Sequence, residues 1–129
     1  MPAPTDLSVL TDFFDRYGAA LTMGDIPAVA GCYALPGMVV ADSYSFTFTS
    51  PAAVALSFLG AAPAHRDQRI VAANAEFLDV RQLSDALTLV AVEWEYLDSD
   101  GQALTGERFH YLLRTDSSGP RITTVVATH

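Results

Sequence analysis

The sequence of 129 residues is half hydrophobic and only 17% charged, which is typical of a globular chain and not of a disordered one. Its net charge is −8 and all seven basic residues are arginine, so neither nucleic acid nor an anionic membrane surface is an expected partner. No apolar run approaches the roughly 18 residues of a membrane span, and the length predicts one domain over residues 1–129.

Cysteine and histidine usage narrows the expected chemistry. The single Cys32 cannot form an internal disulfide, which favours a reducing cytosol, although a secreted protein without disulfides would look the same. Cys32 and the three histidines, His65, His110 and His129, show no metal-ligand spacing, so no metal site is predicted. The first ten residues lack both a basic region and an apolar core, and no secretion signal is expected there.

The first predicted element is a helix that Thr5 or Asp6 can cap and that runs to about Met23. Phe13 and Tyr17 lie four residues apart and therefore share one face of this helix. That face is expected to pack against the rest of the chain.

A second, short helix is predicted over about 26–33, because Gly24 can end the first helix and Asp25 can cap the next one. The wholly apolar run 38–41 then predicts a buried strand. Asp42 stands where this apolar pattern ends.

The next segments are expected to be a strand, a helix and a loop. A turn at Pro36-Gly37 should lead into the strand at 38–41, and residues 43–49 alternate as a second strand with three aromatic side chains on one face. Those side chains are Tyr44, Phe46 and Phe48. Ser50 followed by proline predicts a third helix that ends at Gly60, and residues 61–69 form a loop.

The rest of the chain reads as strands joined by short turns. Their expected ranges are 70–83, 86–97, 103–115 and 121–128. The first should contain a bulge near Phe77, where its alternation slips. Helices followed by antiparallel strands are the pattern of an α+β fold.

Alternation in the strand 86–97 assigns its two faces. The inner face carries Thr88, Val90, Val92, Trp94 and Tyr96. The outer face then carries Leu87, Leu89 and Ala91, together with Leu112 of the next strand. An exposed apolar patch of this kind usually marks an interface, so a homodimer through the outer face of the sheet is expected.

The same alternation predicts an ion pair across two strands. Glu93 and Arg108 both face outward if the parity holds, and a hairpin loop at 99–102 would place them opposite each other. The pair therefore tests the register of the sheet.

Four short segments, taken in order, resemble the nuclear-transport-factor-2-like (NTF2-like) superfamily and, within it, the ketosteroid isomerases. They are Arg16-Tyr17, Gly24-Asp25-Ile26, Tyr33 and Val40-x-Asp42. The resemblance implies three N-terminal helices packed on a strongly curved antiparallel sheet, the cystatin-like or NTF2-like α+β barrel. It further implies that the sheet forms a cone with an apolar pocket for a small hydrophobic molecule.

Asp42 is the first candidate for chemistry. It matches the general base of the isomerases, with one extra residue between Tyr33 and the acid, and burial in an apolar pocket would favour that role. The alternative is a strand-end carboxylate that is bonded to nearby backbone or solvated. An acid at this position also occurs in other members of the superfamily, including polyketide cyclases.

Two tyrosines complete the implied catalytic set. Tyr17 matches the family tyrosine that donates a hydrogen bond to the oxyanion, and otherwise it is a core side chain. The family's second donor is an aspartate three residues before an arginine, and counting back from Arg114 reaches Tyr111. A phenol could keep the donor role, but a core tyrosine that fills the cone is slightly preferred.

The expected pocket lining comes from both helices and strands. It consists of Phe13, Phe46, Phe58, Trp94, Phe109, Val125 and His129. His110 alternates away from Tyr111 and is expected on the outer face, whereas parity aims His129 at the pocket mouth unless the terminus frays.

Two functions follow from these expectations. The first is an isomerase or lyase that needs no cofactor, in which Asp42 moves a proton and Tyr17, with Tyr111, stabilises the enolate oxygen. The second is a non-catalytic module that binds a small molecule or forms a dimer, because a fold does not determine a function. An epoxide hydrolase fits less well, since it needs an arginine between two acids and only one acid is placed inside.

Overall fold

The computed structural model describes residues 7–54 and 70–127. Several expectations lie outside these ranges: the cap at Thr5 or Asp6, the later part of the third helix with Phe58, the loop 61–69, and His129. Each of these stays a prediction.

Two helices and the start of a third form as expected. α1 spans Leu7–Met23 and α2 spans Ile26–Gly31, where the Asp25 carboxylate accepts a hydrogen bond from the Ala28 amide at 3.3 Å. A helical turn covers 51–54, and the Ser50 hydroxyl accepts from the Ala53 amide at 3.2 Å. Asp25 at the start of α2 and Ser50 at the start of the helical turn at 51–54 are therefore the caps that the sequence indicated.

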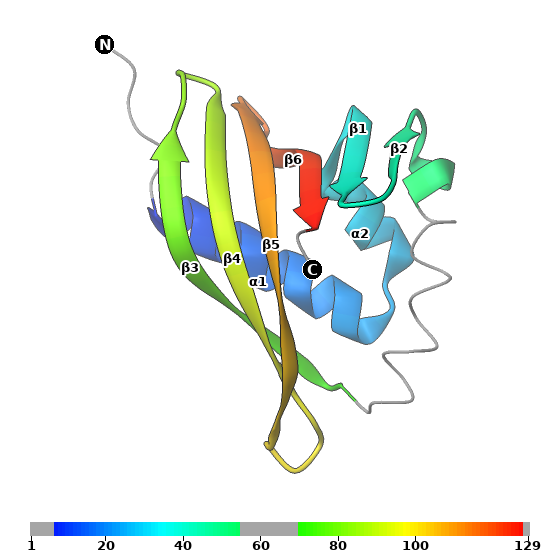
Figure 1. Cartoon of the computed structure of the whole chain (residues 1–129), viewed down its shortest axis with the longest axis vertical. Coiled ribbons are helices and arrows are strands. Elements are labelled where there is room, and N and C mark those ends of the chain that lie inside the picture. Colours follow the sequence, from blue (N-terminus) through cyan, green and yellow to red (C-terminus); the bar gives the residue numbers. More distant parts are fainter. Residues whose placement is uncertain (1–6, 55–69, 128–129) are drawn as a thin grey trace.

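Six strands form one sheet in the order β2-β1-β6-β5-β4-β3. Their bounds are β1 Tyr33–Ala41, β2 Ser45–Phe48, β3 Ala72–Gln82, β4 Leu87–Leu97, β5 Ala103–Asp116 and β6 Gly119–Ala127. The sheet is strongly curved and open, and α1 crosses one face of it behind β3, β4 and β5 (Figure 1). The expected α+β architecture is confirmed.

The beginning of β1 differs from the expectation. The second helix was expected to extend to Tyr33, with a turn at Pro36 before the strand; instead β1 already begins at Tyr33 and includes a cis Leu35-Pro36 bond. The register with β6 shifts between Tyr33 and Met38, so this irregular stretch still pairs at both ends. Local turn residues were outweighed by pairing with a strand that lies far away in sequence.

The sheet is antiparallel except at one junction, where β1 and β6 run parallel. A wholly antiparallel sheet was expected, because short turns join the neighbouring strands of each hairpin. β1 and β6 are instead separated by most of the chain, and no turn fixes their relative direction. This junction connects the β1–β2 hairpin with the meander from β3 to β6.

Three further irregularities interrupt the sheet. One lies between Phe77 and Asp79 in β3, as the slipped alternation predicted, and the others lie between Trp94 and Tyr96 and between Leu112 and Leu113. At the second of these, Gly106 approaches the Trp94 carbonyl so closely that a Cβ at position 106 would collide with it. Such bulges increase local twist and help the sheet to curve.

The predicted inner face of β4 is confirmed, whereas its outer apolar residues are less exposed than expected: Ala91 is buried, and Leu87 and Leu89 are half-buried. Its inner residues Thr88, Val90, Val92, Trp94 and Tyr96 are all buried. On the outer face Glu93 lies opposite Arg108, and Arg108 Nη2 donates to Glu93 Oε2 at 3.2 Å. The half-exposed pair contributes little to stability, but it confirms the predicted register.

No helix within residues 7–54 and 70–127 is long and apolar enough to cross a membrane.

Candidate functional site

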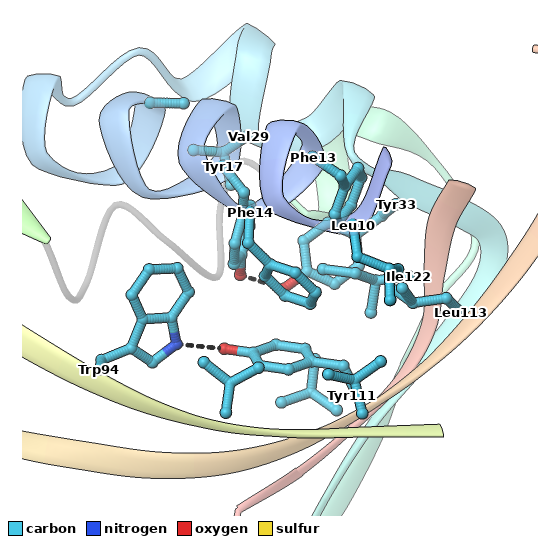
Figure 2. Packing of buried hydrophobic residues seen from close by; sticks show 14 of the residues in the cluster. Leu10, Phe13, Phe14, Tyr17, Val29, Tyr33, Trp94, Tyr111, Leu113 and Ile122 are labelled. Carbon is cyan, nitrogen blue, oxygen red and sulfur yellow. Dashed lines mark hydrogen bonds between the residues drawn. The ribbon is translucent and has the colours of Figure 1, made fainter. Parts of the chain in front are cut away.

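The candidate site is the interior between α1 and the sheet, where four polar aromatic groups meet (Figure 2). The hydroxyl oxygens of Tyr17 on α1 and Tyr33 at the start of β1 lie 2.7 Å apart and share a hydrogen bond. Trp94 Nε1 on β4 donates to the Tyr111 hydroxyl on β5, also at 2.7 Å. All four residues are at most 5% exposed.

Aromatic rings pack around these hydroxyls. Tyr17 contacts the rings of Tyr33, Trp94 and Tyr111 with centroid distances of 6.0, 6.1 and 6.1 Å. Phe14, on the same helix, packs on Tyr111 at 5.1 Å and on Trp94 at 6.2 Å. The protein's own side chains therefore pack closely around the two hydroxyl pairs.

The surroundings of the tyrosines make them weaker acids. Burial raises the pKa of Tyr17 well above its ordinary value, and the neighbouring Tyr33 and Tyr111 raise it further. Burial likewise raises the pKa of Tyr111, although its hydrogen bond from Trp94 opposes the shift. Both side chains are thus neutral phenols that keep their protons at any ordinary pH.

Asp42 does not occupy the position expected of an enclosed base. Its side chain is exposed, in the bend that follows β1. The apolar run 38–41 predicts burial on both faces, but β1 and β2 form one margin of the open sheet, and Asp42 lies beyond the last paired residue, Ala41. The expected burial of Asp42 among aromatic groups is wrong.

The other predicted lining residues divide into three groups. Phe13, Trp94 and Val125 are buried in the interior, and Phe109 packs partly buried against the same cluster. Phe46 is 39% exposed and stacks with Tyr44 at the margin of the sheet instead of facing the centre. Phe58 and His129 lie outside the described residues.

Tyr33 is the interior polar residue that the sequence analysis did not assign to the site. It was expected at the end of a helix, and its pairing with Tyr17 depends on its place in β1 instead. The sequence feature that could have identified Tyr33 is its place among the segments that resemble the ketosteroid isomerases. Nothing in the local alternation of residues indicates that its hydroxyl pairs with Tyr17.

Two neighbouring cavities lie at another place, between α2, the start of β1 and the end of the β5–β6 hairpin. The larger, of about 470 Å³, is lined by Ala30, Leu35, Pro51, Arg114, Asp116 and Arg121, among others. The smaller, of about 420 Å³, is lined by residues of α2 together with Pro51 and Ala52. In the part of the chain described, no three histidine, cysteine, aspartate or glutamate side chains gather as a metal site.

Solved structures with the same fold were found for nearly the whole chain. Aln2 from a Streptomyces species has a TM-score of 0.72 at 18% identity, over 100% of this chain and 94% of that one. An NTF-2 like protein of unknown function from Shewanella oneidensis has a TM-score of 0.70 at 12% identity, over 95% and 98% of the two chains. A ketosteroid isomerase-like protein from Erwinia carotovora atroseptica has a TM-score of 0.65 at 19% identity, over 98% and 97%.

Identities this low support the fold and not a shared activity. No curated protein of similar sequence was found for the chain. One family model, described as NTF2-like protein (DUF6841), matches residues 8–129. The match covers every helix and strand described above except the first residue of α1, and the chain therefore belongs to this family of NTF2-like proteins.

Proposed function

We propose that this NTF2-like chain acts as a non-catalytic module that forms a homodimer through the outer face of its sheet. The proposal rests on the hydrogen-bond partners and the exposure of the predicted catalytic residues. The Tyr17 hydroxyl is paired with Tyr33, the Tyr111 hydroxyl accepts from Trp94, and Asp42 is exposed. Enolate chemistry needs a base and donors that face one enclosed substrate, and this arrangement does not favour it.

The outer face of the sheet supports the dimer. Leu89 pairs with Leu112 across β4 and β5, and Val126 of β6 pairs with Val40 of β1. Leu89, Leu112 and Val126 alternate with buried inner residues and so point away from α1, and Val40 is the cross-strand partner of Val126. These four half-buried side chains are here called the outer patch. An apolar area on the side opposite the helices is suited to pairing with a second copy, because two-fold symmetry matches identical patches.

A charge in the outer patch should separate the dimer. Leu112→Asp would place two like charges near each other across a two-fold interface, and we expect the dimer to weaken at least about a hundredfold. Sedimentation velocity at micromolar concentration measures the change. Thr11→Asp, at an exposed position of α1 on the opposite face of the sheet, is the control and should leave the dimer intact.

A wild-type chain that sediments as a monomer throughout the micromolar range would refute the dimer. Circular dichroism of Leu112→Asp, compared with the wild-type spectrum, separates loss of the dimer from loss of the fold.

The second candidate function is the cofactor-free isomerase or lyase acting on a small hydrophobic ketone. The buried hydroxyls favour it: neutral phenols in an apolar interior are suitable donors to an oxyanion, and Tyr111 accepts from Trp94 while it keeps its own proton. Asp42 would then have to reach its substrate from the margin of the sheet.

Exchange of the protons next to a ketone carbonyl tests this candidate without knowledge of the natural substrate. If the chain accelerates loss of deuterium from α-deuterated cyclohexanone, we expect Asp42→Asn to abolish the acceleration. Tyr17→Phe should cost less than the roughly 10²–10³-fold typical of a lost oxyanion donor, because Tyr111 can replace it in part.

Asp12→Asn changes an exposed carboxylate on α1 and is the matched control. Wild-type exchange at the buffer rate, or an Asp42→Asn variant as active as this control, would remove the enzyme candidate and leave the non-catalytic module.

A further inference from the structure

We propose that the larger cavity, between α2, the start of β1 and the end of the β5–β6 hairpin, binds a small molecule that carries one carboxylate on an apolar body. We call it the arginine cavity, because Arg114 and Arg121 line it together with Asp116. The inference goes beyond the proposed dimer and does not depend on it. It rests on the charges of the lining, their pairing, and the apolar surface beside them.

Two like charges lie opposite each other at this cavity. Arg114 on β5 and Arg121 on β6 are direct cross-strand partners, an arrangement that is unfavourable unless an anion compensates it. Asp116 compensates only in part: its Oδ2 lies 3.9 Å from Arg121 Nη1, and its Oδ1 accepts the Ser118 amide in the turn. Within the described residues Arg114 forms no ion pair.

This accumulation of positive charge is unusual for the chain. The protein has a net charge of −8 and seven arginines, of which two line this one cavity. Arg81 is paired with Asp79 at 2.6 Å and Arg108 with Glu93 at 3.2 Å, each at a one-to-one ratio. At the arginine cavity the ratio is two cations to one carboxylate, which leaves one positive charge for a ligand.

Mostly apolar residues line the rest of the cavity, together with Tyr33. The cavity is lined by Ala30 from α2, Leu35 from β1 and Pro51 from the helical turn at 51–54. The second cavity shares Ala30, Gly31 and Pro51 with the first and adds Ile26 and Pro27, so a ligand anchored at the arginines can extend along α2. The volumes of about 470 and 420 Å³ fall in the range of small-molecule sites.

These features select a class of ligand. Arginine guanidinium groups match the two oxygens of a carboxylate, and one uncompensated positive charge suits a monoanion better than a doubly charged phosphate. The apolar extension favours an aliphatic chain or a ring over a small hydrophilic acid. Octanoate has both features and serves as the probe.

The test is a titration of the isotope-labelled full chain with octanoate, followed by backbone amide shifts. We expect shifts at 30–35 and 114–121, and about tenfold weaker binding in Arg114→Gln and in Arg121→Gln, because each loses a charge-assisted hydrogen bond. Both arginines are exposed, so neither variant should unfold the protein. Arg81→Gln is the control: Arg81 is exposed as well, its ion pair with Asp79 lies outside the cavity lining, and the variant should bind octanoate like the wild type.

Octanamide and inorganic phosphate complete the experiment. Octanamide has the same chain without the charge, and equal affinity for it would overturn the proposal. Phosphate that binds as tightly as octanoate would also overturn it, because the apolar lining would then contribute nothing. Octanoate shifts centred on Tyr17 and Trp94, which do not line the arginine cavity, or unchanged affinity in both arginine variants, would place the ligand elsewhere and overturn the proposal.

Discussion

Replacing Phe14 with alanine is expected to lower the free energy of unfolding by roughly 3–5 kcal/mol, the usual cost of removing a buried phenyl ring. Phe14 is 0% exposed, and its ring packs against Phe77, Trp94 and Tyr111, with centroids at 5.6, 6.2 and 5.1 Å. It therefore joins α1 to three strands of the sheet. A loss of this size is a large part of the roughly 5–15 kcal/mol that stabilises a typical domain.

Urea denaturation followed by circular dichroism measures this loss. Phe46→Ala makes the same chemical change where the ring is 39% exposed, and its cost should be clearly smaller. Phe14→Leu should fall between them, because it keeps part of the buried volume. Equal losses for Phe14→Ala and Phe46→Ala would mean that α1 does not pack on the sheet as described.

Most of the fold could be predicted from the sequence because its signals are local. Asp25 as a cap, the bulge near Phe77 and the inner face of β4 each depend on a few neighbouring residues, and all three are confirmed. The Glu93–Arg108 pair was predictable for a related reason: a short hairpin fixes which residues lie opposite each other. The parallel junction of β1 and β6 could not be predicted this way, since no turn connects them.

The candidate site was only partly predictable. Alternation and helix spacing placed Tyr17, Trp94 and Tyr111 inside, but the hydroxyl pairs depend on where α1, β1 and β4 meet in space. The apolar run before Asp42 was consistent with burial at its end, whereas actual exposure depends on which strands lie at the margin of the sheet. The arginine cavity joins residues about ninety positions apart, and no local pattern reveals it.

Stability should fall steeply above about pH 10, because the interior hydroxyls keep their protons only in the folded state. Burial, the largest cause in each case, raises the pKa of Tyr17, Tyr33, Tyr96 and Tyr111. In the unfolded chain a tyrosine has a pKa of about 10, so above that pH the unfolded state binds fewer protons than the folded state. The free energy of unfolding is therefore unaffected by these groups below about pH 10 and decreases as pH rises above it.

Each such tyrosine contributes a limiting slope of about 1.4 kcal/mol per pH unit, so four together approach about 5.5 kcal/mol per pH unit. Urea denaturation at about pH 9, 10 and 11 gives the slope. Tyr17→Phe removes one titrating hydroxyl and should reduce the limiting slope by about one tyrosine's share, even if it also lowers stability at neutral pH. Tyr44→Phe, at a side chain that is 58% exposed, is the control and should leave the slope unchanged. A slope that is the same in all three proteins would show that the Tyr17 hydroxyl is accessible to water, and the closely packed interior described for Tyr17 and Tyr33 would then be wrong.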